Sequence, residues 1–261
     1  MNAANDFDDM TLDPPGTICV AGAGPLGLEA ALYGRFLGYK VTVFDSGEHV
    51  AQSLRGRRDL PLPFSPADCL SRLAQGAIDA QFDPPPSTQP MTVGEWIDRK
   101  IEPLSKTDLL RDQIRLGNAV AKIDWVQSDE NLTDTSTEET KQGTNDSQSP
   151  PANCDADDES TKGTDAFEIV GDVPPDFAVH LNSGDDAEPL LHAGDFEAVI
   201  LTRGQHDAIQ LPGEPPLDYL FIIDADVMAN GGRDAGLRQI RDCYARLAGR
   251  RELDLYAPLR R

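Results

Sequence analysis

The sequence predicts an α/β fold built on a parallel sheet, and three observations lead to this class. Residues 17–22, TICVAG, form a short apolar run that ends in glycine. Residues 25–38 then carry apolar side chains at helical spacing. Residues 40–45, KVTVFD, form a second run that is rich in β-branched residues. A strand, a helix and a strand in this order make a β-α-β unit, whose two strands lie parallel in one sheet.

Three glycines follow the first strand at the spacing G-x-G-x-x-G, namely Gly22, Gly24 and Gly27. In such a loop the first glycine permits a tight turn, and the second lets a diphosphate approach the backbone. The third lets the helix pack closely against the strand. The start of the helix offers unpaired N–H groups and partial positive charge to an anion. Glycines, strands and helix in register therefore predict a Rossmann-type dinucleotide site.

Asp45 closes the second strand, where a carboxylate accepts both hydroxyls of an adenine ribose. The same carboxylate repels a 2′-phosphate, so the sequence disfavours NADP at this site. Two alternatives remain open at this point. One is a glycine turn in a flavodoxin-like sheet without a ligand, and the other is a Rossmann unit that has lost its ligand.

Further elements follow along the chain. Thr92 and Glu95 form a capping box, which predicts a helix to about Ile101. Residues 113–126 are expected to be extended, and three more strands are expected within residues 166–172, 176–184 and 196–204. Residues 217–224 form another apolar strand. Residues 234–249 predict an amphipathic helix that ends at a glycine.

Composition excludes several classes of function. The formal net charge is −22, from 23 Lys and Arg against 45 Asp and Glu, and such a field repels nucleic acid and anionic lipid surfaces. No apolar run reaches the roughly 20 residues of a membrane span. The acidic N-terminus is unlike a signal peptide, and four scattered cysteines without a C-x-x-C pair argue against disulfides, zinc and dithiol chemistry. We therefore expect a cytoplasmic protein without a metal site.

One segment interrupts the predicted domain. Residues 127–165 hold eleven acidic residues against two lysines, a net charge of −9, and almost no apolar side chains. Such a segment cannot bury enough apolar surface to offset its ordering entropy. We expect residues 1–15 to be a flexible acidic arm and residues 16–261 to form a single domain. A disordered acidic insertion at 127–165 would interrupt that domain, and a role of the insertion in interactions stays open.

The start of the chain resembles the two-dinucleotide-binding-domain flavoproteins, the group of pyridine nucleotide–disulfide reductases and flavin monooxygenase-like enzymes. The three glycines, followed by Ala31 and then Gly38, match the long form of that group's fingerprint. Pro25 is typical of its FAD site rather than of its NAD site. The resemblance implies FAD as the cofactor, with NAD less favoured. It places Pro25 and Leu26 at the diphosphate beside the glycines.

A second resemblance lies downstream, in EAVILTRGQHDAIQLPGEP, residues 197–215. It implies that Gly204 contacts the flavin nucleotide through its backbone, although Arg203 stands where the group has a small residue. The strands near residues 114–126 and 166–181 would then form an antiparallel β-meander over the adenosine end, with Val120 lining the adenine. The last strand ends in Asp224, which the resemblance places at the ribitol, although Ile223 replaces the usual glycine.

Several side chains are candidates for chemistry without a firm role. His206 follows the turn where the flavin ring is expected, but a solvated loop histidine is the alternative. Arg55, Arg57 and Arg58 could hold a phosphate or an anionic substrate, the alternative being a solvated turn that pairs with the excess acid. No residue is named as the catalytic acid or base. Trp96 and Trp125 are expected to be core or sheet aromatics.

The leading hypothesis is an FAD-binding oxidoreductase-like protein, in which the flavin carries hydride or electrons to or from a small-molecule substrate or an electron-donor protein. The sequence contains no second G-x-G-x-x-G, and five residues separate LPG from the last strand. The nicotinamide domain of the group is therefore expected to be absent. The alternative is a noncatalytic dinucleotide-binding or interaction protein, a shortened remnant of such an enzyme. The substrate and the oligomeric state are left open.

Overall fold

The computed structural model describes residues 12–14, 16–65, 68–82, 89–126, 177–183, 189–202, 209–212 and 219–257. The chain divides into a unit of Met1–Gln127 with Asp172–Arg261 and a unit of Ser128–Gly171. All described residues belong to the first unit. The predicted acidic insertion at 127–165 lies outside the described residues.

A five-stranded parallel sheet forms the centre of the first unit, in the order β3-β2-β1-β7-β8. Its strands are β1 (Thr17–Ala21), β2 (Lys40–Asp45), β3 (Ile114–Leu116), β7 (Ala198–Thr202) and β8 (Leu220–Ile223). Every neighbouring pair is parallel. The order is that of the Rossmann fold, with β7 and β8 in the fourth and fifth places. The predicted α/β class and its β-α-β unit are confirmed.

β1 is the central strand of this sheet and β7 lies next to it. Both strands are buried, and β7 is buried along its whole length. The chain runs from β1 to β2 on one side, while β7 lies on the other, so the strand order reverses between β1 and β7. Ligands of open α/β sheets bind at the carboxyl ends of strands at such a switch point. The hydroxyl of Thr202 donates to the carbonyl of Ala21 at 2.8 Å and joins the two strand ends there.

A second, antiparallel sheet has the order β4-β5-β6, from β4 (Val120–Trp125), β5 (Phe177–Leu181) and β6 (Leu191–Phe196). An antiparallel meander was predicted, but its strands differ in part from the predicted ones. Residues 114–116 belong to the parallel sheet instead, because Gly117 turns the chain at a φ of 70°. Residues 166–172 lie outside the described part. β6 was not predicted, since its residues are mostly exposed and its extended form depends on pairing with β5.

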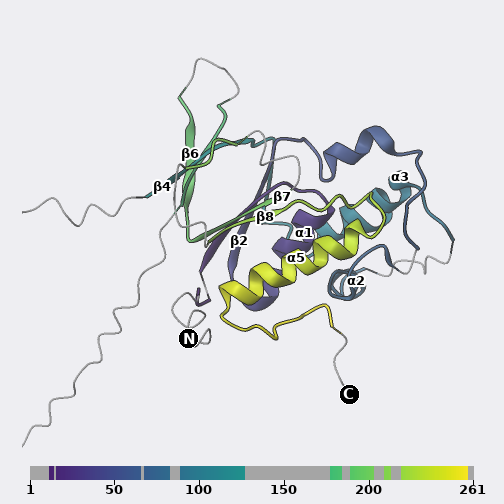
Figure 1. Ribbon diagram of the computed structural model, residues 1–261. Coiled ribbons are helices and arrows are strands. Elements are labelled where there is room, and N and C mark those ends of the chain that lie inside the picture. Colours follow the sequence, from purple (N-terminus) through teal and green to yellow (C-terminus); the bar gives the residue numbers. More distant parts are fainter. Residues whose placement is uncertain are drawn as a thin grey trace, which may run out of the picture. The chain divides into compact units, whose positions relative to one another are not determined.

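Two helices lie side by side against the parallel sheet, α1 (Pro25–Leu37) and α5 (Gly232–Leu247) (Figure 1). Tyr244 of α5 is fully buried, stacks on Tyr33 with ring centroids 5.0 Å apart, and donates to the carbonyl of Ala30 at 2.8 Å. The α5 helix confirms the amphipathic pattern predicted for residues 234–249. Among the described residues, no helix is both long and apolar enough to cross a membrane.

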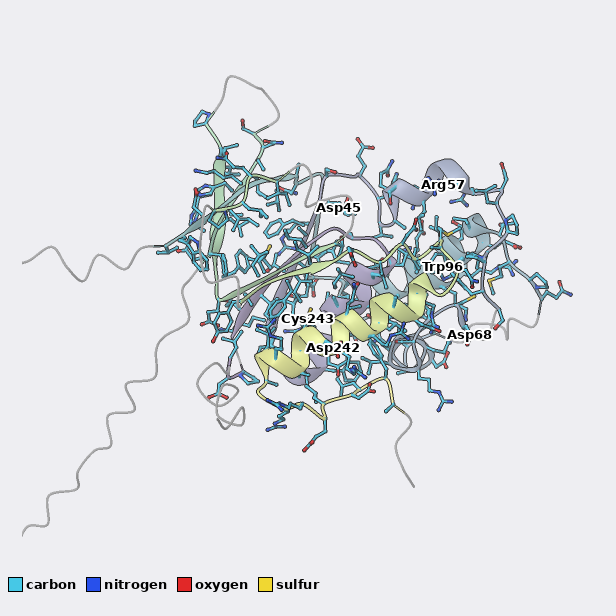
Figure 2. All side chains as sticks on the ribbon, viewed as in Figure 1. Asp45, Arg57, Asp68, Trp96, Asp242 and Cys243 are labelled. Atoms are coloured by element: carbon cyan, nitrogen blue, oxygen red, sulfur yellow. The ribbon has the colours of Figure 1, made fainter. Side chains whose placement is uncertain are left out.

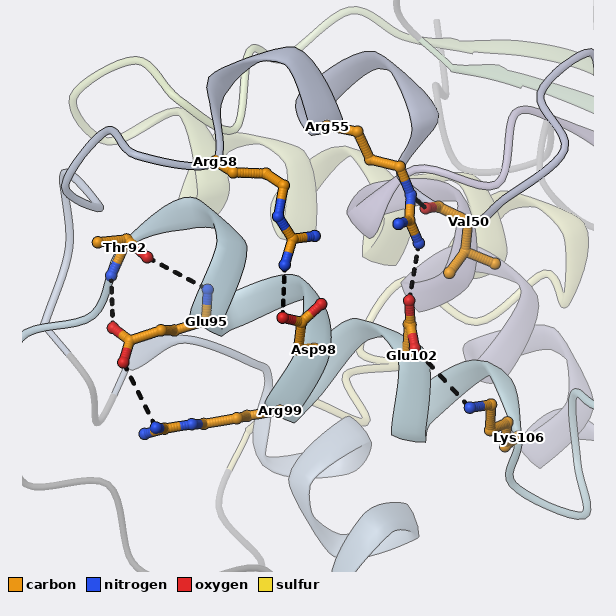
Figure 3. Close-up of polar contacts among 9 residues, drawn as sticks. All are labelled: Val50, Arg55, Arg58, Thr92, Glu95, Asp98, Arg99, Glu102 and Lys106. Carbon is orange, nitrogen blue, oxygen red and sulfur yellow. Dashed lines mark hydrogen bonds and ion pairs between the residues drawn. The ribbon is translucent and has the colours of Figure 1, made fainter.

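Short helices form a second group: η1 (Gln52–Arg57), α2 (Arg72–Asp79), α3 (Val93–Trp96), η3 (Ile97–Ile101) and α4 (Glu102–Ser105). The predicted capping box is present, with the Thr92 hydroxyl accepting from the backbone of Glu95 and the Glu95 carboxylate accepting in return (Figure 3). Trp96 is buried as predicted and donates through Nε1 to the carbonyl of Cys69 at 2.9 Å. Trp125 packs on Phe177 in the antiparallel sheet, again as predicted.

Leu12 lies within the range expected to be a loose arm, yet it is buried. Its N–H donates to the carbonyl of Leu247 at 2.7 Å, and its carbonyl accepts from the hydroxyl of Tyr39 at 2.7 Å. The first bond ties the chain before β1 to the end of α5, and the second ties it to the residue that precedes β2.

Glu29 is a charged side chain in the buried part of α1 and is 4% exposed. Its two oxygens accept from the N–H of Ser71 at 2.9 Å and from the hydroxyl of Ser71 at 2.6 Å, and Ser71 also caps α2. Burial raises the pKa of the Glu29 carboxyl, and the bonds from Ser71 and the nearby charge of Arg233 lower it by less. Glu29 therefore links α1 to α2 through hydrogen bonds, although its carboxyl group loses hydration by being buried in the core.

Glu29 gives the stability of the fold a defined dependence on pH. Because its pKa is higher in the folded chain than in the unfolded one, its favourable contribution is present at low pH and is lost as the pH rises through the folded value. Glu29→Gln cannot ionise. The free energy of unfolding of the native chain, minus that of the variant, should therefore fall in urea titrations as the pH is raised above the ordinary range of a carboxyl group. A difference that stays constant or rises would contradict this assignment.

Candidate functional site

The glycine loop lies at the switch point and has the conformation that its sequence predicts. Gly22 has a φ of 109°, which favours glycine, and its N–H donates to the carbonyl of Phe44 at 2.7 Å. A Cβ on Gly27 would lie 1.9 Å from the carbonyl oxygen of Gly22. The first glycine thus makes the turn, and the third lets α1 begin directly against the end of β1.

Gly24 differs from the other two glycines because nothing in the described fold requires it. A Cβ at this position would have no atom within 4 Å, and the backbone angles, φ −74° and ψ 176°, suit any residue. Gly24 is the N-cap of α1, and no side chain caps this helix start. The first turn therefore presents uncapped N–H groups and the positive end of the helix dipole to open space.

A cavity of about 310 Å³ occupies this space. Four segments line it: the start of α1, the helix η1, the end of β7 and the loop after β8. The lining residues are Gly24, Pro25, Leu26, Gly27, Ser53, Leu54, Arg57, Thr202, Ala225, Asp226 and Val227. The volume is at the lower end of the roughly 300–1,000 Å³ of small-molecule sites. The cavity thus brings together four of the predicted cofactor residues, 24–27.

Asp45 lies at the carboxyl end of β2, beside the glycine loop, and is 7% exposed (Figure 2). One carboxylate oxygen accepts from the N–H of Ala23 at 2.6 Å, and the other accepts from the N–H of Gly47 at 2.7 Å. The side chain therefore fixes the loop between the first two glycines. Each oxygen keeps a second lone pair, which is what a ribose hydroxyl would need.

Among the described residues, the predicted cofactor residues Val120 and Asp224 are not part of the lining. Val120 is buried in β4, one residue after Ala119, whose carbonyl accepts from Asn182. Asp224 is exposed and accepts from the side-chain amide of Gln239. Gly204, like Arg203 and His206, lies outside the described residues.

Among the described lining residues the acidic one is Asp226, two positions after Asp224. Its Oδ1 accepts from the N–H of Met228 at 3.0 Å. A Cβ on Gly232 would lie 1.7 Å from the carbonyl oxygen of Asp226, so a side chain at position 232 would clash with it. The loop after β8 therefore turns back tightly to begin α5. Sequence reasoning chose the first acid after the strand, and the repeated acid in DAD was the available signal for the second.

The described histidines and Ser65 are not among the lining residues of the cavity. His49 and His192 are exposed, and His180 is half-buried on the antiparallel sheet. Ser65 donates to the carboxylate of Asp68 at 2.6 Å in a local turn. Within the described ranges, no three His, Cys, Asp or Glu side chains are grouped so that they could hold a metal ion. The cavity lining offers a hydroxyl, a guanidinium, a carboxylate and backbone N–H groups.

Comparison with known proteins gives structural neighbours alone. No family model and no curated protein matches the chain. An oxidised steroid monooxygenase bound to NADP has 15% identity and a TM-score of 0.41, over 71% of this chain and 26% of its own. OTEMO with FAD bound has 16% identity and a TM-score of 0.42, over 72% of this chain and 25% of its own. A polycyclic ketone monooxygenase from Thermothelomyces thermophila has 11% identity and a TM-score of 0.40, over 71% of this chain and 22% of its own. The chain thus spans about a quarter of each neighbour's length.

Proposed function

We propose that the chain binds FAD with its diphosphate at the start of α1, and that it acts as an FAD-binding oxidoreductase-like protein. The observation that carries the proposal is that the fold itself does not require a glycine at position 24. This residue leaves open space at an uncapped helix start, inside a cavity at the switch point of a parallel sheet. A close approach of diphosphate to the backbone accounts for a glycine that the fold itself does not need.

The residues present suit a dinucleotide. Residues 24–27 would face the diphosphate, and Asp45 would face the adenine ribose with its remaining lone pairs. FAD is favoured over NAD by the proline after the second glycine and by the long glycine spacing. When bound, the flavin supplies the hydride or electron transfer, and the protein binds it, orients it and sets the surrounding charge.

The alternative is a noncatalytic dinucleotide-binding protein. It is favoured by the cavity lining, which within the described part of the chain includes no histidine or cysteine that could move a proton or electrons. Bleaching of bound flavin by NADH, by NADPH or by a panel of small reductants distinguishes the two. A flavin that none of them reduces supports the noncatalytic protein.

Gly24→Val tests the binding site. The added side chain has room in the free protein, so we expect the free energy of unfolding to change by less than about 1 kcal/mol. Because the side chain fills the space of the diphosphate, the affinity for FAD should fall by roughly 100-fold or more, equivalent to about 2.7 kcal/mol. Flavin fluorescence titration measures this, with NAD and NADP as parallel ligands.

Gly76→Val on α2 is the matched control, because its Cβ is also unobstructed and lies away from the cavity lining. It should bind FAD as the native chain does. If Gly24→Val retains native affinity, the glycine loop is not the binding site. If the native chain binds no FAD, the proposal itself fails.

A further inference from the structure

We infer that Arg57 is the side chain that neutralises the diphosphate, while Arg55 and Arg58 hold η1 in place. The inference rests on the proposed function, because it concerns the same cavity. It distinguishes three arginines that lie within four residues of one another and that the sequence cannot tell apart.

Two of the three arginines already have partners. Arg55 donates to the carboxylate of Glu102 at 2.7 Å, and Arg58 donates to the carboxylate of Asp98 (Figure 3). Both acids belong to the helical segment of residues 93–105. Arg57 lies between these two arginines in sequence, lines the cavity and is exposed. Its side chain makes no ion pair or hydrogen bond within the part of the chain that the structure describes.

The helix η1 is fixed on both sides, so the position of Arg57 is set before a ligand arrives. On one side the N–H of Ala51 donates to the carbonyl of Ala23, in the glycine loop, at 2.9 Å. On the other side are the two ion pairs to Asp98 and Glu102. Ala51 has a φ of 53°, a left-handed conformation that is unusual for alanine and that the surrounding bonds maintain. Residues of η1 and of the start of α1 line the same cavity, and Figure 2 labels Arg57 on η1.

The charge around the cavity favours a cation there for binding an anionic ligand. The chain has a net charge of −22, and the first turn of α1, residues 25–28, contains no charged side chain. Asp226 adds a negative charge to the lining, and Arg57 is the basic residue among the described lining residues. A dianionic diphosphate would otherwise meet the helix dipole alone. A guanidinium offers paired N–H donors that match two phosphate oxygens.

The test compares Arg57→Ala with Arg111→Ala, because each variant removes one positive charge and only the first changes the cavity lining. We expect Arg57→Ala to weaken the binding of both FAD and ADP by about 10- to 100-fold, the range for a hydrogen-bonded ion pair. Arg111 is an exposed residue that belongs neither to η1 nor to the lining, so Arg111→Ala should change these affinities by less than about 3-fold. Arg57→Lys should recover part of the loss, since it restores the charge without the paired donors.

Salt dependence separates a direct contact from a loss of structure. The native chain and Arg111→Ala should bind ADP more weakly as KCl is raised, and Arg57→Ala should show a shallower dependence because one ionic contact is gone. Equal affinities of Arg57→Ala and Arg111→Ala for FAD and ADP overturn the inference and leave the proposed function standing. An unchanged salt dependence also overturns it. A native chain that binds neither FAD nor ADP refutes the proposed function itself.

Discussion

Gly27→Ala is expected to lower the free energy of unfolding by about 2 kcal/mol or more. The added Cβ would lie 1.9 Å from the carbonyl oxygen of Gly22, so the loop or the helix must move. Such an overlap costs about 3 kcal/mol, which outweighs the gain of up to about 1 kcal/mol from alanine in a helix. Urea unfolding followed by circular dichroism measures the loss. The shifted loop should also lose affinity for FAD.

Gly76→Ala in α2 is the matched control, because its Cβ has no atom within 4 Å. It should raise the free energy of unfolding by about 0.5–1 kcal/mol, as alanine does at an unobstructed helical position. If Gly27→Ala is as stable as Gly76→Ala, α1 does not pack against the glycine loop as described.

Trp96→Ala should have the largest effect on stability, a loss of about 3–5 kcal/mol. The side chain is 1% exposed and packs edge-on against Phe64 with ring centroids 5.2 Å apart. Its removal also leaves the carbonyl of Cys69 without its donor, which places the loss in the upper part of that range. Circular dichroism in urea is the measurement, because the substitution removes a fluorophore.

Phe36→Ala supplies the comparison for Trp96. Phe36 is an aromatic residue of α1 that is 49% exposed, so its truncation should change the free energy of unfolding by about 0.5 kcal/mol. A loss below about 1 kcal/mol for Trp96→Ala would show that the helical group of residues 93–105 is not packed around this side chain.

Local signals predicted the elements whose structure depends on neighbouring residues. The glycine spacing, the apolar runs of β1 and β2, the capping box at Thr92 and the apolar face of α5 all act within one or two turns or a single strand. η1 and β6 were not predicted, because they depend on distant partners. η1 is held by residues 93–105 through Arg55 and Arg58, and β6 is extended because β5 pairs with it.

The residues of the candidate site also fall into those that a local pattern predicts and those that depend on distant contacts. Residues 24–27 come from a local pattern and were predicted, whereas the choice among neighbouring side chains of one kind was not. Arg57 differs from Arg55 and Arg58 because those two pair with acids that lie 47 and 40 positions from them in sequence. Asp226 differs from Asp224 through the tight turn into α5. Both distinctions need the tertiary structure, because neighbours in sequence carry the same charge.

The pairing of β1 with β7 has a consequence for the order of events during synthesis. Ala21 and Thr202 meet at the switch point although 181 positions separate them, and the loop with Asp226 comes later still. Contacts of such separation form slowly, since a long loop must close first. A chain emerging from the ribosome makes its glycine loop near the beginning and completes the surrounding cavity near the end. Cofactor capture should therefore follow synthesis of almost the whole chain, and a nascent chain released before β8 should stay colourless.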